Sequence, residues 1–527
     1  MRHLLQRLGG FLPAAVALVL PLIFLPIASD SYILPRASIV IAGACLGAGI
    51  SLLLPDGPRL GDLRWPLFAA AAAALLAFAF SISWPLSLAG SYTRYESLPM
   101  RLSYIGLLAS SVWLLHTARQ RSAVVAMFVF GTGVVSLLGV GQWAGHAAYR
   151  PDGNLGNANL LAALVAMALP LAVDRALRGG IFVFAWAMAI VVLAAGLFVT
   201  TSRSGAFGAV AGCLTLAVLA TRGRLVIGSA IVSLGIVGVG LFVMLGSPLR
   251  ALNNDPPELR LHLWGDALHM IAARPLTGWG EDATGLAFGH FLSQDYASLV
   301  TFDRVHSGPL DIAATQGILG LAALGWVLVV LAVRAWRHRL DRDVAALSAA
   351  LVGYTVWVVF NFDWSPATGA FWLLAGTLWS AQAPPHSWGP RAAAHGGGGA
   401  RGIHPWRPAV AVVLVAAALV FAVFPILADV WYLRGRSDLS VQVDPLQPQY
   451  HWSLGDGLIA THNLEGGVTE LRRAADLGET EPSFYVELGD RELDLGNKSR
   501  ARRDYERALE IDPYYTPASQ RLSTLGG

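Results

Sequence analysis

The chain has 527 residues, of which 55% are hydrophobic and only 13% are charged, and its mean hydropathy is +0.55. Soluble domains carry about 25% charged residues, so the composition excludes a soluble globular enzyme as the whole protein, a disordered chain and a disulfide-rich scaffold. The formal net charge of +3 is too small for the basic surface of a nucleic-acid-binding protein. The sequence therefore predicts an all-α, polytopic membrane protein.

Thirteen apolar stretches are predicted to be transmembrane helices, because about 20 apolar residues cross the hydrocarbon layer of a bilayer. They centre on residues 11–27, 37–54, 66–83, 101–115, 123–143, 158–173, 181–199, 205–220, 225–246, 309–333, 344–360, 367–380 and 409–430. Asn157 or Asn159 is expected to cap the sixth of these helices. The stretches 344–360 and 367–380 are candidates for kinked or partly re-entrant segments.

Arginine is distributed unevenly between the predicted loops. If the N-terminus is cytoplasmic, the cytoplasmic segments hold 17 of the 36 arginines and the outside loops hold nine, four of them in the loop 247–308. Positive residues accumulate on the cytoplasmic side of membrane proteins. We therefore expect a cytoplasmic N-terminus, with the loop 247–308 and the tail from residue 431 on the outer side of the membrane.

The composition also predicts the division into domains. Residues 1–380 are expected to form a membrane-embedded domain that includes the outside loop 247–308. Residues 381–408 are rich in Pro and Gly without periodicity, which is typical of a flexible linker, here on the cytoplasmic side. Residues 409–430 form the last predicted transmembrane helix, and residues 431–527 form a separate tail.

The tail contains an internal repeat of 34 residues, an offset that relates Gly455 to Gly489. Paired helices with this period are typical of tetratricopeptide repeats, and we expect residues 449–515 to form two of them. Because about three repeats are usually needed for stability, the pair must pack on the membrane domain, on residues 516–527 or on a partner. The tail is interpreted either as a solvated helical surface or as a groove for a peptide or protein partner.

Three arginines in predicted outer loops are candidate ligand-binding residues. Arg203 lies at the tip of a short hairpin between two spans, and Arg260 lies on a predicted amphipathic surface helix. A guanidinium held at the membrane surface can bind a diphosphate through two parallel hydrogen bonds; the alternative is contact with lipid headgroups. Arg94 is expected to bind an anion, to pair with Glu96 or to contact a lipid headgroup.

His306 ends the long outer loop directly before a predicted span, with Asp303 nearby in the sequence. A histidine at the boundary between water and membrane suits a general base near neutral pH; the alternative is a histidine that only hydrogen-bonds the loop. His262, Asp266 and His269 have a spacing that permits a metal ion, but no further strong donor is evident. We therefore expect no metal and no other cofactor.

The ordered set of these motifs resembles the O-antigen ligase superfamily over roughly residues 10–380. The motifs are Ser83-Trp-Pro-Leu-Ser87 with Gly90 and Arg94, Gly156-Asn-Ala-Asn159, Ser202-Arg203-Ser-Gly205, Arg260 with Trp264 and Pro275-Leu-Thr-Gly278-Trp-Gly280, and His306-Ser with Gly317-Ile-Leu-Gly320. The superfamily includes bacterial O-antigen ligases, polymerases of the same membrane fold and protein O-oligosaccharyltransferases. One departure is Ser307, where the family often has Asn, and this leaves the positioning of the acceptor open.

The resemblance implies a C-type glycosyltransferase-like fold in the bacterial inner membrane. It implies metal-independent transfer of a glycan from undecaprenyl diphosphate to an acceptor hydroxyl on the periplasmic side. In this scheme Arg203 and Arg260, with Arg94 as a third candidate, bind the diphosphate, and His306 activates the acceptor. The acceptor is a lipid A-core sugar in a ligase, a growing glycan in a polymerase or a protein in an oligosaccharyltransferase, and the sequence does not separate these.

A non-enzymatic protein is the competing hypothesis: a flippase for lipid-linked sugars, or an assembly scaffold that uses the tail as a dock. A flippase is expected to carry ionisable residues deep within its spans, along a transport path. Here the charged residues gather at the ends of the predicted spans and in the outer loop. This distribution favours chemistry at the membrane surface.

Overall fold

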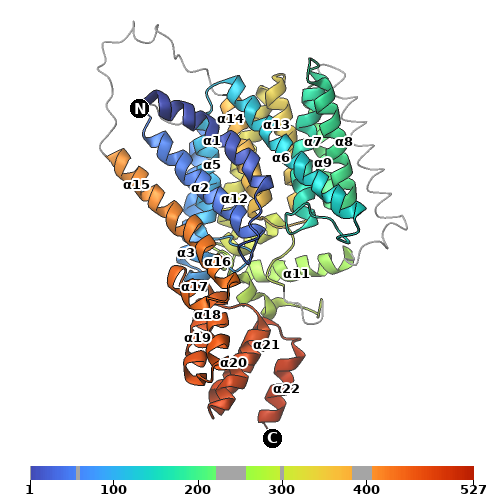
Figure 1. Ribbon diagram of the computed structural model, residues 1–527. Helices are drawn as coiled ribbons and strands as arrows, with labels where there is room; N and C mark the ends of the chain where they lie inside the picture. The colour runs from blue at the N-terminus through green and yellow to red at the C-terminus, as the bar shows by residue number, and fades with distance from the viewer. Residues whose placement is uncertain (1, 55–59, 221–256, 297–301, 383–405, 527) are drawn as a thin grey trace.

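The computed structural model of the chain describes residues 2–54, 60–220, 257–296, 302–382 and 406–526 (Figure 1). Within these ranges all regular secondary structure is helical, which confirms the predicted all-α class. The predicted span 225–246 and most of the predicted linker 381–408 lie outside the described residues.

The described part of the chain places most of its helices in one bundle. These helices are α1 (Arg2–Leu22), α2 (Ile33–Leu52), η1 and α3 (Gly61–Leu63 and Arg64–Ala79), α5 (Leu98–Leu114), α6 (Ala118–Ala144), α7 (Ala158–Leu177), α8 (Val183–Thr200), α9 (Arg203–Leu219), α12 (Gly308–Arg337), α13 (Arg342–Val359), α14 (Ser365–Gln382), and α15 and α16 (Trp406–Ala418 and Phe424–Leu433), joined by the π-helical turn Leu419–Val423. Among the described residues, eight helices are long and apolar enough to cross a membrane, and Gly9–Leu22 and Arg203–Leu219 are shorter apolar helices. The protein is thus a multi-pass membrane protein, while the number of thirteen spans stays a prediction.

Helix α7 forms the centre of the bundle. All side chains from Leu160 to Ala168 are buried, and the helix packs against α6, α8, α9 and α13. A helix that is apolar on all sides is stable only in such surroundings. Asn157 caps it by accepting a hydrogen bond from the backbone N of Asn159 at 2.8 Å, which confirms the predicted cap.

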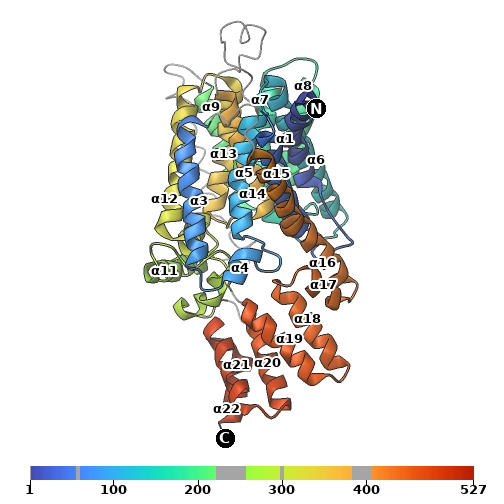
Figure 2. The same cartoon turned by 90° about the vertical axis from the view of Figure 1, so that its left-hand side faces the viewer.

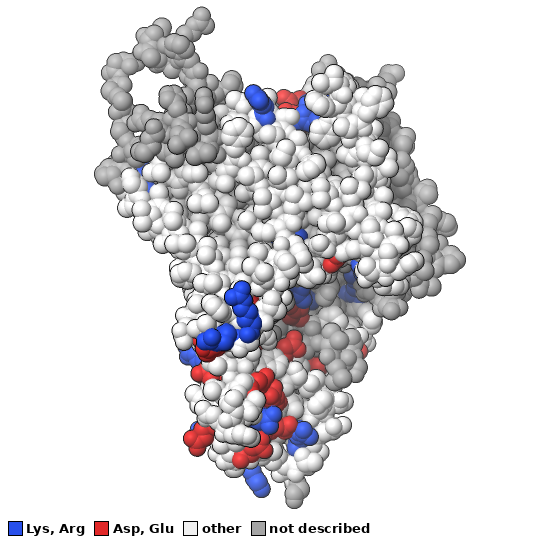
Figure 3. Space-filling view, in the orientation of Figure 1, with Lys and Arg blue, Asp and Glu red and all other residues white. Residues whose placement is uncertain are grey.

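The outer surface of the bundle is apolar. Phe184, Met188 and Val191 on α8 are exposed, as expected for side chains that face lipid. In Figure 3 the visible face of the bundle is almost free of charged residues, which gather at its upper edge and on the tail below. This distribution agrees with a bundle that lies in a bilayer.

Helix α12 is interrupted at Gly317, which has a φ of 68° inside the helix. The backbone of a neighbouring loop fills this break: Ile318 N donates to Pro275 O at 2.8 Å. A Cβ atom on residue 317 would lie 2.2 Å from Leu276 O, so only glycine fits. The break therefore fixes the loop after α11 against a membrane helix.

The N-terminus and the tail lie at opposite ends of the bundle (Figure 1). Near the tail, α11 (Pro257–Ala273) runs across the direction of the bundle helices, and α4 (Trp84–Ala89) lies at the same end (Figures 1 and 2). Short 3-10 turns at Thr284–Leu286 and Phe288–Phe291 complete this end. Which end faces the periplasm stays a prediction from the arginine distribution.

The tail consists of helices that pack in pairs. They are α17 (Ser437–Val443), α18 (Pro448–Ala460), α19 (Leu464–Leu477), α20 (Pro482–Asp494), α21 (Lys498–Ile511) and α22 (Thr516–Leu525). The starts of α18 and α20 are 34 residues apart, as are those of α19 and α21. A Cβ atom on Gly489 would lie 2.4 Å from the Tyr505 ring, and one on Gly455 would lie 2.9 Å from Leu471. The helices of each pair thus touch at equivalent positions; their assignment as tetratricopeptide repeats stays a prediction.

Asp429, near the end of α16, fixes the tail to the bundle. Its buried carboxylate accepts hydrogen bonds from Asp30 N at 2.7 Å, Tyr92 Oη at 2.8 Å and Tyr450 Oη at 3.2 Å. These donors come from the loop before α2, from the loop after α4 and from the second helix of the tail, α18. The tail therefore packs on the membrane domain, and α22 packs on α20 and α21.

Candidate functional site

His306 lies directly before α12 with a φ of 56°. Such values are uncommon for residues other than glycine, and they persist where the surrounding structure holds the backbone in place. Its Nδ1 atom is 3.1 Å from the carbonyl oxygen of Arg304. Because a carbonyl can only accept, Nδ1 donates, and the lone pair of the neutral ring is on Nε2. The imidazole thus presents Nε2 as a basic atom.

The His306 ring is held between aromatic side chains. It packs edge-on against Phe302 and Phe362, with centroid distances of 5.8 and 5.4 Å. Burial lowers the pKa of His306 below its ordinary value; the charge of Arg260 lowers this pKa further, and Asp303 opposes the shift. His306 is therefore neutral, and able to accept a proton, around neutral pH.

Arg94, from the loop after α4, reaches one of these aromatic side chains, Phe362. Its Nε and Nη2 atoms bind the two carboxylate oxygens of Asp303 at 2.7 and 3.1 Å. Its guanidinium lies over the rings of Phe362 and Trp364 at 4.9 and 4.8 Å. Arg94 and His306 thus both pack on Phe362.

Pairing of Arg94 with Glu96, one of the predicted alternatives, is wrong. The Glu96 carboxylate accepts a hydrogen bond from Tyr104 Oη at 2.7 Å and lies 3.9 Å from Arg101. Burial raises the pKa of Glu96 to about 7, while Arg101 and Tyr104 oppose the rise. The two side chains separate because Glu96 enters the bundle, whereas Arg94 stays at its end.

Arg260 projects from α11 toward the turn between α13 and α14. Its Nη1 donates to the carbonyl oxygen of Phe360 at 2.8 Å. Trp264, one turn later on α11, lies against the Phe360 ring with a centroid distance of 6.3 Å. The structure therefore places Arg260 and His306 close enough for the charge of the first to affect the pKa of the second.

Arg203 is the first residue of α9, and the residues on both sides of it are fixed. Ser202 caps the helix and donates through Oγ to Asn159 Oδ1 at 2.8 Å. Ser204 Oγ accepts a hydrogen bond from Asn361 Nδ2 at 2.9 Å. Arg203 is thus tied, through its neighbour, to the same turn that binds Arg260.

The turn between α13 and α14, residues 360–364, organises the whole site. It accepts the hydrogen bond of Arg260, binds the residue that follows Arg203, and packs against both Arg94 and His306. Sequence reasoning missed this turn and predicted only that its flanking helices could be re-entrant. The available signal was the sequence Phe-Asn-Phe-Asp-Trp, which places an acidic residue between two apolar helices.

A buried ionic network holds the 360–364 turn. Arg101 Nη1 is 2.8 Å from Asp363 Oδ2, and Arg101 Nε is 3.1 Å from Glu281 Oε2. Tyr354 Oη donates to Asp363 at 3.1 Å, and Gln316 Nε2 donates to Glu281 at 2.6 Å. These residues join α5, α12, α13, the loop after α11 and the turn. Sequence reasoning treated Arg101 only as one of the outer arginines.

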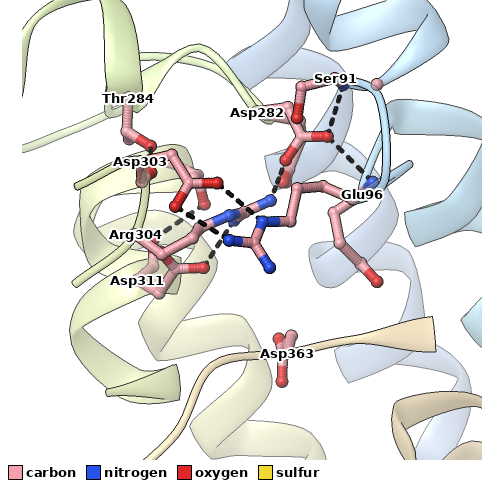
Figure 4. A network of polar contacts seen from close by, with 12 residues as sticks. Ser91, Glu96, Asp282, Thr284, Asp303, Arg304, Asp311 and Asp363 are labelled. Atoms are coloured by element: carbon pink, nitrogen blue, oxygen red, sulfur yellow. Dashed lines mark hydrogen bonds and ion pairs between the residues drawn. The ribbon is translucent and has the colours of Figure 1, made fainter. Parts of the chain in front are cut away.

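A second buried network fixes the backbone that orients His306. Arg304 pairs with Asp311 at 2.7 Å and also with Asp282, which accepts a hydrogen bond from Glu96 N at 3.0 Å. Figure 4 shows Arg304 between the carboxylates of Asp282 and Asp311. The carbonyl that accepts the hydrogen bond from His306 Nδ1 belongs to Arg304, whose side chain is itself held by two carboxylates. Functional side chains need such fixed surroundings to keep their geometry.

The predicted spacing on α11 does not bring metal ligands together. Asp266 is buried and accepts hydrogen bonds from Tyr296 Oη at 2.5 Å and Ser293 Oγ at 3.1 Å, whereas His262 and His269 are exposed. In the described ranges, no three His, Cys, Asp or Glu side chains lie together as a metal site would require. Metal independence of the reaction stays a prediction.

A family model described as O-antigen ligase matches residues 188–325, about a quarter of the chain. The matched range contains Arg203, Arg260 and His306, but neither Arg94 nor the 360–364 turn. A search of curated proteins found no match. The family match supports the O-antigen ligase superfamily and, together with the apolar helices, a membrane protein with a glycan-transferring, ligase-like function.

Proposed function

We propose that this protein transfers a glycan from undecaprenyl diphosphate to an acceptor hydroxyl on the periplasmic side of the bacterial inner membrane, without a metal ion. One observation carries the proposal: Nδ1 of His306 is held by the Arg304 carbonyl, so that Nε2 is a base close to the charge of Arg260. The base can remove the proton of an acceptor hydroxyl, and the cation beside it can stabilise the negative charge of the leaving group.

The reaction is a displacement at the anomeric carbon of the donor glycan. His306 Nε2 removes the proton of the acceptor hydroxyl as its oxygen forms the new bond to that carbon. The bond between the carbon and the diphosphate oxygen breaks, and undecaprenyl diphosphate leaves with the electron pair. The imidazolium then releases its proton to water, which restores the base.

The arginines bind and neutralise the diphosphate. Arg203 lies in the first turn of α9, and Arg260 lies in the first turn of α11. Arg260 donates a hydrogen bond to the 360–364 turn, and the residue after Arg203 accepts one from it. Guanidinium groups suit phosphate oxygens because they donate two parallel hydrogen bonds. Arg94 already binds both oxygens of Asp303, so we assign it a positioning role beside His306 rather than direct phosphate contact.

The arginine distribution supports the orientation in which the N-terminus is cytoplasmic. The long loop and the tail share one end of the bundle, opposite the N-terminus (Figure 1). We therefore place His306 and the tail together in the periplasm, where acceptors for lipid-linked glycans are found.

Glycan transfer in reconstituted vesicles tests the proposal. The full chain receives a glycan on undecaprenyl diphosphate, EDTA and a panel of sugar and protein acceptors. Transfer is expected for the unchanged chain and for His290→Ala and Arg337→Ala, which alter an exposed histidine of the same loop and an exposed arginine at the far end of α12. Loss of glycan transfer is expected for His306→Ala and Arg203→Ala.

Two results would overturn the proposal. Full activity of His306→Ala would remove the base from the mechanism. Movement of labelled donor across the bilayer without any product would replace transfer by transport.

A further inference from the structure

A cavity of about 300 Å3 lies between the tail and the site end of the bundle. The bundle contributes residues 91–94, Gly285 and Asp303, and the tail contributes residues 447–449 and 478–481. The cavity therefore exists only where both parts of the chain meet, and the reaction described above does not account for it.

The cavity is acidic. Asp303, Glu479 and Glu481 contribute three carboxyl groups against the one guanidinium of Arg94, which already binds both oxygens of Asp303. Burial raises the pKa of Glu479 to about 7, so this group is only partly ionised at neutral pH, and Glu481 and Asp303 supply most of the negative charge. Burial raises the pKa of Glu481, and the charge of Asp303 raises it further, so these two carboxylates are electrostatically close. A phosphate or another anion is therefore disfavoured in this cavity.

The wall of the cavity also offers hydrogen-bond acceptors. Asp303 and Glu481 line it, and an ionised carboxylate accepts hydrogen bonds but donates none. Gln447, on the same wall, is only 2% exposed, and its Nε2 donates to Gly90 O at 3.3 Å. A ligand with many hydrogen-bond donors therefore suits this wall.

The cavity is held in a fixed shape. Thr93 and Tyr95 in its bundle-side loop have φ values of 68° and 57°, which persist where the surroundings determine the backbone. Tyr92 in the same loop is held by Asp429, which also binds Tyr450 of the tail. A preformed cavity binds a ligand without the cost of ordering loops.

The cavity adjoins the proposed base. Arg94 forms part of its wall and lies 4.9 Å from the centroid of Phe362, and the Phe362 ring is 5.4 Å from that of His306. A molecule in the cavity is thus separated from His306 by one stacked pair of side chains. The cavity therefore lies beside the site, with Arg94 and Phe362 between it and His306.

We infer that this cavity is the acceptor subsite, built jointly by the membrane domain and the tail, and that it takes a neutral carbohydrate rather than a phosphorylated sugar. Sugar hydroxyls donate hydrogen bonds to the carboxylates of the wall and carry no charge that these carboxylates would repel. The inference rests on the proposed function, because glycan transfer requires an acceptor hydroxyl.

Saturation-transfer NMR on the full chain in lipid nanodiscs tests this inference without catalysis. The probes are a neutral hexose tetrasaccharide, the same tetrasaccharide with a phosphate group, and a lysine-containing peptide. A Cβ atom on Gly285 would lie 3.5 Å from both Asp303 and Thr480, so Gly285→Ala fits and Gly285→Phe fills the cavity. The neutral probe is expected to give a signal with the unchanged chain and Gly285→Ala and to lose it with Gly285→Phe.

Glu481→Gln provides a second variant that changes charge and not shape. It is expected to weaken binding of the neutral probe by about tenfold, the effect of losing a charge-assisted hydrogen bond of roughly 1.4 kcal/mol. Glu506→Gln, on the exposed surface of α21, is the matched control and is expected to bind normally.

Three results would overturn the inference. They are no signal from the neutral probe with the unchanged chain, an undiminished signal with Gly285→Phe, or a stronger signal from the phosphorylated probe or the peptide. Affinity for undecaprenyl-diphosphate glycan, measured on the same nanodiscs, separates the two proposals. Loss of donor binding in the unchanged chain contradicts the proposed function, whereas normal donor binding with no saccharide signal contradicts only the acceptor subsite.

Discussion

The two ends of the bundle use the same residue types differently. Away from the tail, Arg178 joins Asp174 at 2.6 Å and Asp343 at 2.7 Å, which ties the end of α7 to the start of α13. At the tail end, Arg101 and Arg304 are buried among carboxylates, and they fix the backbone around His306. The comparison teaches that Arg–Asp pairs alone do not mark a site. The tail end differs because its pairs orient a group, His306, whose second ring nitrogen is available for chemistry.

The largest expected effect is on catalysis at the tail end. His306→Gln removes the base but keeps a polar side chain of similar size, and we expect kcat/KM for glycan transfer to fall by about 10²–10⁴-fold. The measurement is the initial rate in vesicles over a range of acceptor concentrations. His290→Gln, in the same loop and exposed, is the control, and an equal loss in both variants would contradict the assigned role.

The next effect is on stability. Arg101→Met leaves Glu281 and Asp363 buried without their cation, a change that costs about 3–5 kcal/mol. The expected result is a large drop in the denaturation midpoint in detergent micelles. Adding Glu281→Gln and Asp363→Asn to the same chain is expected to restore part of the loss. An unchanged midpoint for the single variant would show that the network does not hold this end together.

A smaller effect is expected in the pH dependence of glycan transfer. Because burial and the charge of Arg260 lower the pKa of His306 below 6.5, the neutral base persists as the pH falls to 6.5 and is lost only at lower pH. The acid limb of a plot of log kcat/KM against pH is expected to have its midpoint below 6.5. A midpoint above that value would mean that another group controls the limb.

The smallest effect belongs to the opposite end. The Arg342 side chain is 54% exposed and lies 3.9 Å from Asp174, and such pairs contribute about 0–1 kcal/mol. Arg342→Ala is therefore expected to leave glycan transfer unchanged and the denaturation midpoint nearly so. A decrease in the denaturation midpoint as large as that caused by Arg101→Met would contradict the difference proposed between the two ends.

Much of the helical architecture was predictable, because membrane helices follow from local composition. The predicted spans 123–143 and 158–173 fall within α6 and α7, and the predicted span 181–199 overlaps α8 from residue 183 onward, since an apolar run and its length are properties of neighbouring residues. The cap at Asn157 was predictable for the same reason.

The partners within the site were not predictable from the sequence. Arg94 and Asp303 are 209 residues apart, and Arg101 and Asp363 are 262 residues apart. No periodicity relates such residues, because their meeting depends on how the helices pack. His306 and Arg203 at the outer ends of spans, together with Arg260 on the predicted surface helix of the outer loop, pointed to one site, but the 360–364 turn that joins them is visible only after folding.

The carboxylate of Asp429 also sets the order in which the molecule can be completed. It binds the backbone of Asp30, 399 residues earlier in the chain, and synthesis at about 5–20 residues per second separates the two by roughly 20–80 s. During that interval the loop that carries Arg94 lacks the hydrogen bond from Tyr92 to Asp429. A chain that stops before the last membrane helix therefore carries every proposed catalytic residue and yet lacks the contact that holds the loop of Arg94 through Tyr92.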